Sequence, residues 1–200
     1  MVYPFTDSQI LGISTFPYSL KDFFLEGTQQ VSASWITLEN LSFPYCISIN
    51  SSYIYEQSTD ERINQNDAAI TLAHELGHYL GLRHVFSEGG TTSMCTDTDY
   101  CKDTPSYNRS EYEQWLNNLD KQNKYQLKDL AKRYSCEKGE YEAHNIMDYA
   151  YCFYNEITLE QRKRIRHILN YSPLIPGPKE SRIDTRGVQG RLNLPICIMK

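Results

Sequence analysis

Residues 74–84 read HELGHYLGLRH and are the most informative stretch of the chain. Side chains four positions apart share one face of an α-helix, so His74 and His78 can present two imidazoles to one metal ion. Glu75 lies beside them, and Gly81 permits a sharp turn that would bring His84 round as a third ligand. Three nitrogen ligands leave the fourth position of a zinc ion open, which is typical of a catalytic site.

The chemistry that such a site performs is hydrolysis. Zinc lowers the pKa of a water toward ~7, and Glu75 can take the proton as the water attacks a carbonyl, then pass it to the leaving amine. The HExxH pattern alone recurs by chance on the order of once per several thousand positions, whereas five positions are fixed here. We therefore predict zinc bound by His74, His78 and His84, with Glu75 as general base.

The segments before the motif are short and differ from it in periodicity. Apolar bursts at 10–16, 31–38 and 45–55, broken by Pro and Gly, are typical of strands and connecting loops. Helical spacing then begins behind a cap at Asn66 or Asp67. These patterns predict a small sheet followed by the helix that carries the motif.

The segments after the motif predict a loop and two helices. Residues 86–108 are rich in Gly, Ser, Thr and Asp, as expected of a long ordered loop. Residues 110–134 are polar and helix-forming, which predicts a surface helix. A further helix should run over 158–170, capped by Thr158 with Gln161 at its third position.

Charge and hydropathy exclude several classes of protein. The 200 residues carry a formal net charge of −5, with no broad basic face, so we expect no nucleic-acid partner. No apolar run approaches the roughly 20 residues that cross a bilayer, and residues 1–10 lack a signal core. The length fits one catalytic domain and demands no second copy, so we expect a monomer without a transmembrane segment.

Cysteine usage favours an oxidising compartment. None of the six cysteines forms a CxxC pair, so disulfides are favoured over a thiolate metal site, with buried free thiols as the alternative. Clustering predicts two bridges, Cys95 with Cys136 and Cys101 with Cys152, although spacing alone does not determine the connectivity. We expect a secreted or cell-envelope protein whose export signal is absent from this sequence.

At this point the sequence resembles a known family. The pattern HExxHxxGxxH is that of the metzincins, and HNIMDY at 144–149 is similar to the Met-turn of their pappalysin, or ulilysin-like, branch. DTP at 103–105 matches a segment of the same branch. The resemblance spans residues 10–169, and 71–86 is its most specific part.

The resemblance implies an α/β (α+β) metzincin fold, with a small twisted sheet and the active-site helix over a loop-rich lower lobe. It implies zinc-dependent cleavage of protein or peptide substrates. Met147 would form a hydrophobic floor beneath the zinc and Tyr149 would stabilise the oxyanion, although core filling and packing are the ordinary roles of these residue types. His144 would make a structural hydrogen bond, and His167 is assigned no role.

The family also holds calcium near the loop that follows the zinc ligands. Asp97, Asp99, Asp103 and Thr104 supply hard oxygen ligands at close spacing here. A solvated acidic loop is the alternative interpretation.

The domain prediction places a catalytic domain at 1–175, with an upper lobe at 1–82 and a lower lobe at 83–175, and a tail at 176–200. The family has more strands before the zinc helix than 73 residues hold, so we expect missing upstream sequence, and a substrate-binding edge strand around 47–53. The insert at 111–133 has no inferred role.

Two rival functions differ in class from an endopeptidase. One is a zinc-binding pseudoenzyme or interaction protein on the same scaffold. Glu75 makes this alternative less favoured, because a structural site has no use for a base beside an open metal position. The other is a zinc amidase. The third ligand here is a histidine within the motif, rather than a distant Cys or Glu, and this makes the amidase less favoured.

Overall fold

In the computed structural model, the helix that carries the motif is α1, Ala68–Tyr79. The Asp67 carboxylate accepts hydrogen bonds from the Ala69 and Ile70 N–H groups and caps its first turn. Gly81 has a φ of +88°, the left-handed conformation that glycine adopts at least cost, and redirects the chain after the helix. The predicted helix, its cap and its glycine stop are confirmed.

The structure describes most of the chain in seven ranges. These are residues 1–37, 39–41, 45–59, 63–86, 98–121, 123–135 and 137–175. Among the helices of these ranges, none has the length and apolarity needed to cross a membrane.

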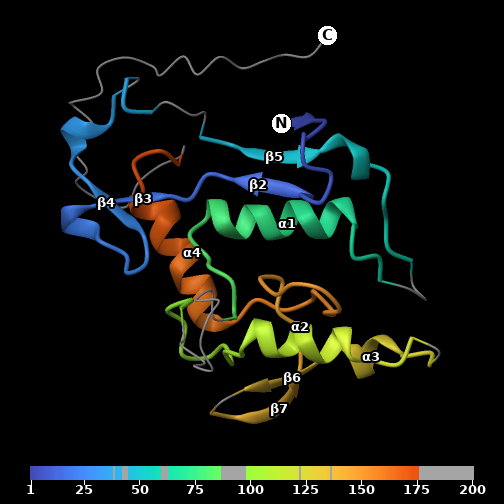
Figure 1. Cartoon of the computed structure of the whole chain (residues 1–200). Helices are drawn as coiled ribbons and strands as arrows, with labels where there is room; N and C mark the ends of the chain where they lie inside the picture. The colour runs from blue at the N-terminus through green and yellow to red at the C-terminus, as the bar shows by residue number, and fades with distance from the viewer. Residues whose placement is uncertain are drawn as a thin grey trace.

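A three-stranded sheet lies over α1 (Figure 1). Its order is β1 (Val2–Tyr3), β5 (Ile47–Asn50) and β2 (Gly12–Ser14), with β1 parallel and β2 antiparallel to β5. Because β5 is paired on both sides, the expectation of an edge strand around 47–53 is wrong. The edge strand next to α1 is β2, which packs directly on the helix.

A second, parallel pair joins this upper region to the C-terminal helix. β3 (Tyr18–Leu20) pairs with β4 (Gln29–Val31), and three short 3-10 helices follow strands at Lys21–Phe23, Ala33–Trp35 and Ser51–Tyr53. α4 (Leu159–Tyr171) packs against β3 and has the predicted capping box between Thr158 and Gln161. The predicted last helix is therefore confirmed.

The region below α1 contains four short elements (Figure 1). They are α2 (Arg109–Asn117), α3 (Leu127–Leu130), β6 (Lys132–Ser135) and β7 (Gly139–Glu142). The prediction of one helix over 110–134 is thus wrong in its second half. Asn and Asp residues at 117–123 favour turns, and β6 alternates buried Arg133 and Ser135 with exposed neighbours, the period of a strand.

A buried cluster connects the region after α1 with α2 and the turn around Met147. Its members are Leu82, Val85, Phe86, Tyr107, Tyr112 and Met147. α4 belongs to the predicted lower lobe, yet Ser172 at its end donates to the Tyr18 carbonyl and Arg164 donates to the Gly81 carbonyl. The boundaries of the two lobes stay a prediction, with α4 in contact with both regions.

The predicted bridge between Cys101 and Cys152 is wrong. Both thiols are free and buried, and each has its own partner, the Asp99 carbonyl for Cys101 and the Asn145 carbonyl for Cys152. Burial raises the pKa of each thiol to about 12, so both are protonated and unreactive at neutral pH. The other predicted bridge, Cys95 with Cys136, lies outside the described residues.

Candidate metal centre and active-site cleft

Three imidazoles converge at the C-terminal end of α1. His74 and His78 lie one turn apart on the helix, and the chain returns after Gly81 to place His84 against them. The Nε2 atoms lie 3.1 Å apart between His74 and His78, 3.0 Å between His78 and His84, and 3.2 Å between His74 and His84. Among the described residues, this is the one group of three side chains placed to hold a metal ion.

Two of these rings are oriented by backbone carbonyls. His74 Nδ1 lies 2.8 Å from the Ile146 carbonyl and His78 Nδ1 lies 2.8 Å from the Leu82 carbonyl. Each Nδ1 therefore carries the hydrogen and donates it, which leaves the Nε2 lone pair facing the centre. Burial and the neighbouring His78 and His84 lower the pKa of His74 to about 3, so its ring is neutral.

The geometry of the three nitrogens fits a metal ion. Nitrogen ligands at ~2.0–2.1 Å in a tetrahedral arrangement lie about 3.3 Å from one another. The observed separations of 3.0–3.2 Å are close to that value. A cation held between the three ring nitrogens would stabilise their close approach.

Glu75 lies next to this group and faces the same cleft. It is 8% exposed, and burial raises the pKa of its carboxyl to about 7. Gly12 on β2 lies directly against it, since a Cβ at position 12 would come within 2.7 Å of Glu75 Cγ. Only a residue without a side chain lets the edge strand approach this carboxyl so closely.

Met147 packs beneath α1 and is fully buried. Its sulfur fills the space beside Gly77, where a Cβ would come within 2.3 Å of Sδ. The turn that carries Met147 also supplies the Ile146 carbonyl that orients His74. The Met-turn segment and the zinc motif are therefore in direct contact.

Gly77→Ala is expected to destabilise the protein. Alanine in a helix interior favours the helix by about 1 kcal/mol, but the new Cβ would overpack buried Met147, which costs ~1–3 kcal/mol. Overpacking should win because the contact with Met147 is so close, and urea denaturation should show a net loss of up to about 2 kcal/mol in the free energy of unfolding. Adding Met147→Val should recover part of the loss. Equal or higher stability of Gly77→Ala would contradict this packing.

Tyr149 borders the three histidines from the side of the cleft. Its ring centroid lies 4.4 Å from that of His84 and 5.4 Å from that of His74, and its side chain is 37% exposed. The guanidinium of Arg109, from the start of α2, lies 4.7 Å over the ring, and Arg109 Nε donates to Glu113. A tyrosine hydroxyl can thus reach a ligand in the cleft while its ring is held on both sides.

The segment from Tyr149 to Tyr151 is supported from below by a buried ion pair. Arg133 Nε lies 3.5 Å from Asp148 Oδ2, and both side chains are excluded from water. Arg133 Nη2 donates to the Tyr149 carbonyl at 3.1 Å and to the Ala150 and Tyr151 carbonyls at 3.4 Å. Burial raises the pKa of Asp148, and the neighbouring Arg133 guanidinium is the main group that lowers this pKa.

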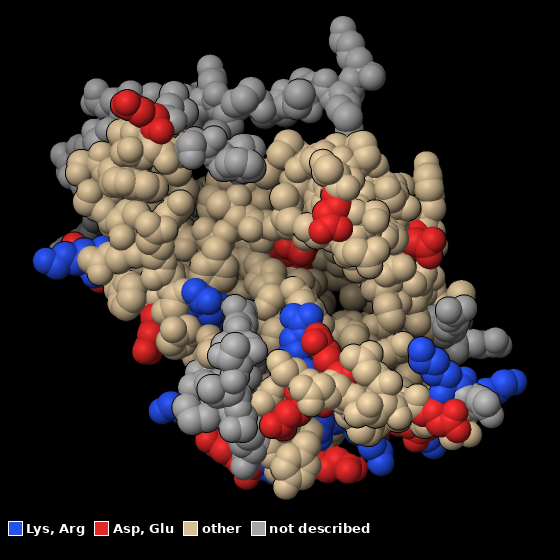
Figure 2. All heavy atoms as spheres, viewed as in Figure 1, with Lys and Arg blue, Asp and Glu red and all other residues tan. Residues whose placement is uncertain are grey.

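The open part of the site is a cavity of about 540 Å³ between β2 and α1 above and the segment after Met147 below. Figure 2 shows a hollow between the upper and lower halves of the molecule on this face. Its lining brings together His74, Glu75, Tyr149, Arg109 and Glu113. A second cavity, of about 1030 Å³, opens on the other side of the histidines and is lined by His78 and His84.

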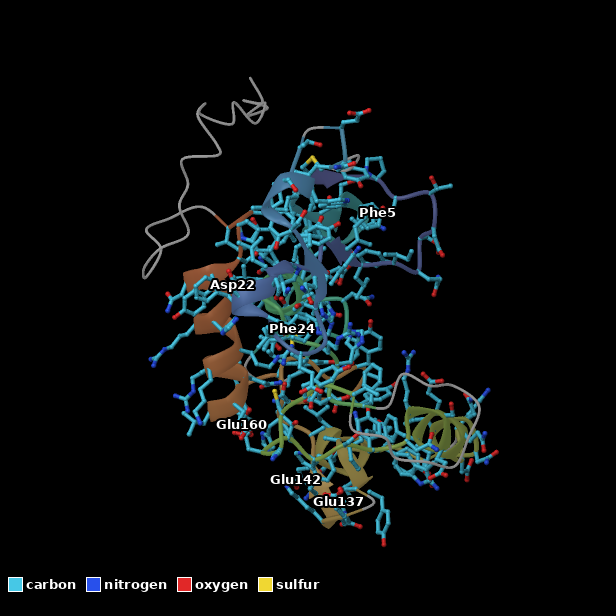
Figure 3. The ribbon with its side chains drawn as sticks, turned by 90° about the vertical axis from the view of Figure 1, so that its left-hand side faces the viewer. Phe5, Asp22, Phe24, Glu137, Glu142 and Glu160 are labelled. Atoms are coloured by element: carbon cyan, nitrogen blue, oxygen red, sulfur yellow. The ribbon has the colours of Figure 1, made fainter. Side chains whose placement is uncertain are left out.

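The predicted calcium ligands are engaged in local hydrogen bonds. The Asp99 carboxylate accepts from the Thr104 hydroxyl and the Cys101 N–H, and Asp103 accepts from the Glu160 N–H at the start of α4. Glu160, which Figure 3 labels at that end of α4, accepts from the Lys102 N–H. Asp97 lies outside the described residues, so calcium here stays a prediction.

The other two histidines lie away from the centre. His144 Nδ1 lies 3.0 Å from Asn155 Oδ1, in keeping with its predicted structural hydrogen bond. His167 Nε2 lies 2.9 Å from the Phe23 carbonyl and connects α4 to the segment after β3.

Three residues that shape the site are not predicted from the sequence. Gly12 had a signal, because glycine inside an apolar strand pattern indicates close backbone approach. Arg109 and Arg133 had none, because arginines in a polar segment are typical of a solvated surface. Their roles follow from the tertiary fold, which turns α2 and β6 under the cleft.

Comparisons with known proteins identify a family of metalloproteases. A family model described as pregnancy-associated plasma protein-A, of the peptidase M43 family, matches residues 35–170. Two relatives, each an extracellular metalloprotease, come from Arthroderma benhamiae and Trichophyton verrucosum, and each is 37% identical over 108 residues. The alignment covers 52% of this chain and 32% of each relative, so the chain spans about a third of their length.

A solved structure is also similar. It is that of Tannerella forsythia mature mirolysin in complex with a cleaved peptide, which is 20% identical, with a TM-score of 0.44. The alignment covers 84% of this chain and 50% of that chain.

Proposed function

The chain belongs to the pregnancy-associated plasma protein-A family of metalloproteases, and we propose that it is itself a zinc endopeptidase with Glu75 as its general base. The family match confirms the resemblance to pappalysins that the motif indicated. The observation that carries the proposal is the convergence of three imidazole Nε2 atoms beside a buried glutamate in an open cleft.

The metal ligands of this proposal are His74, His78 and His84. When bound there, zinc supplies Lewis-acid chemistry that acidifies water and polarises a peptide carbonyl. Support comes from the two carbonyls that orient the rings and from the lowered pKa of His74, which keeps its nitrogen free of a second proton. Met147 would support this group from below through its contact with Gly77.

Glu75 moves the proton in the proposed reaction. Its carboxylate takes a proton from the attacking water and delivers it to the leaving amine. Before a metal ion is bound, burial raises the pKa of this carboxyl to about 7, so both of its forms are accessible near neutral pH. This role also separates an enzyme from a pseudoenzyme, which would not need a base here.

The edge strand β2 gives the substrate a backbone to pair with. Its one partner within the described sheet is β5, and its other side faces the cavity that Leu11 and Gly12 line with Glu75. An extended peptide can add to such an edge by main-chain hydrogen bonds. The substrate would then lie along the cleft with one carbonyl near the histidines and Tyr149.

Tyr149→Phe is expected to lower kcat by about 10²- to 10³-fold and to change KM much less. A hydroxyl that donates to the carbonyl oxygen as charge develops on it stabilises the transition state by about 3–4 kcal/mol. Steady-state kinetics on one peptide substrate measures both constants. Tyr134→Phe, on the exposed side of β6, is the matched control and should behave as wild type. If the turnover of Tyr149→Phe were unchanged, the hydroxyl would have no role in catalysis and Tyr149 would serve only in packing.

Medium or large apolar residues are expected just after the cleaved bond. The wall of the cavity beside Glu75 contains Tyr149, Ala150, Tyr151 and Tyr154. No Asp or Glu occurs in the sequence between positions 148 and 156, so this wall favours an apolar side chain. Besides Glu75, two carboxylates line the cavity. Glu113 is already bonded to Arg109, and Asp148 is buried and paired with Arg133. A profile dominated by Arg or Lys at that position would show that Glu113 exchanges partners, and the expectation would be wrong.

The proposed function is tested by digesting a proteome-derived peptide library with and without a chelator. Cleavage that requires metal and yields a defined residue preference is expected. Absence of cleavage would contradict the proposal, as would cleavage unaffected by chelation. We propose secretion because the relatives are extracellular metalloproteases. The monomeric state and a calcium site near Asp99 and Asp103 remain proposals that rest on the sequence.

A further inference from the structure

We propose that the end of the insert at 111–133, around α3, builds a distal substrate-binding groove. This groove takes an uncharged, polar or aromatic segment of the peptide about four residues from the cleaved bond. This inference rests on the proposed function, because it assigns a second contact to the same substrate. The groove is a cavity of about 910 Å³ beyond the start of α1, within the size range of ligand sites.

The groove adjoins the cavity beside Glu75. Gln65, Asn66 and Tyr151 line both of them. A peptide that leaves the cleft in this direction would therefore meet these three side chains next. The shared lining points to the substrate chain itself as the occupant.

The two walls of the groove come from segments far apart in the sequence. One wall is the stretch just before α1, which includes Ile63 and Gln65. The facing wall is the insert, with Tyr125 and Leu127 at the start of α3. No role for the insert could be inferred from the sequence. Its place along the groove now suggests a role in substrate binding.

The chemistry of the walls selects the ligand. The described lining residues combine amides, aromatic rings and aliphatic side chains, and none carries a carboxylate, ammonium or guanidinium group. Gln65 Oε1 accepts from the Tyr154 hydroxyl at 3.1 Å, which turns its amide nitrogen toward other acceptors. Among the described lining residues, a charged side chain would lose water without gaining a partner, whereas glutamine or tyrosine would find both apolar contact and hydrogen bonds.

The distance along α1 fixes the position of the contact in the peptide. Asp67 precedes Glu75 by eight residues, and at ~1.5 Å per helical residue the groove begins ~12 Å from the catalytic carboxyl. An extended peptide advances ~3.3 Å per residue. The side chain that reaches the groove is therefore about the fourth from the bond that is cut.

Peptide binding to the full chain with Glu75→Gln tests the groove without requiring turnover. The probes are a fluorescent six-residue apolar peptide and two ten-residue peptides that add Ala-Gln-Tyr-Gln before or after it. One of the two extensions is expected to tighten Kd about tenfold. The same extension with Asp and Lys in place of Gln and Tyr should give no gain.

Tyr125→Ala, combined with Glu75→Gln, tests whether the wall formed by the insert causes the gain in affinity. It should reduce the ratio of the two Kd values from about ten to about one. Tyr125 is 37% exposed, so its loss does not remove core packing. Tyr134 is a 74% exposed tyrosine of β6 that does not line this groove, so Tyr134→Ala should keep the ratio. Equal affinity for short and extended peptides, or a ratio insensitive to Tyr125→Ala, overturns the inference. Absence of cleavage by the wild-type chain would count against the proposed function alone.

Discussion

Glu75→Gln is expected to lower kcat by about 10²- to 10⁴-fold while the chain keeps its metal. The amide preserves the size of the side chain but cannot accept a proton from water or return one to the leaving amine, which is the contribution of a general acid–base group. Because Glu75 is not among the three converging nitrogens, the affinity for metal should be little affected. Kinetics together with metal analysis of the same sample measures both effects.

The control for this variant is Glu137→Gln. Glu137 is exposed and lies near the turn between β6 and β7, where Figure 3 labels it away from the cleft. It should show wild-type kcat and metal content. Near-normal turnover of metal-loaded Glu75→Gln would show that another group moves the proton.

Arg133→Met is expected to lower the free energy of unfolding by about 3–5 kcal/mol. The substitution keeps much of the volume but leaves the Asp148 carboxylate buried without its cation, and breaking one side of a buried ion pair has a cost of that size. It also removes the donors to the carbonyls of Tyr149, Ala150 and Tyr151. Urea denaturation measures the loss.

A double variant distinguishes the ion pair from general packing. Arg133→Met with Asp148→Leu replaces both charges by apolar groups and should recover part of the stability. The recovery is partial because the backbone carbonyls and the Tyr107 hydroxyl still lose their partners. Arg166→Met, on the exposed face of α4, is the surface control and should change stability by less than ~0.5 kcal/mol. An Arg133→Met loss as small as that of the control would mean that Asp148 is neutral or solvated.

The centre of the site could be predicted from sequence because its determinants are local. His74 and His78 are related by the helical repeat, and Gly81 sets the turn that returns His84 within a few residues. The caps of α1 and α4 follow from side chains next to the helices, Asp67 and Thr158. In such cases short-range geometry determines the structure.

The supporting structure could not be predicted because its contacts are long-range. Arg133 looks like a surface residue in a polar segment, and only the pairing of β6 with β7 and the proximity of Asp148 explain its burial. The free thiols of Cys101 and Cys152 illustrate the same limit, since cysteine spacing does not determine which thiols meet. The strand at the cleft was misplaced because β5 and β2 are brought together across a long loop.

The zinc content of the purified, active chain tests the central claim most directly. Mass spectrometry of the metal should find one zinc per chain, and His84→Ala should lose both the zinc and the cleavage activity, since two imidazoles hold the ion far less tightly than three. Active protein without zinc would contradict the assignment of His74, His78 and His84, and of the zinc-dependent mechanism with them.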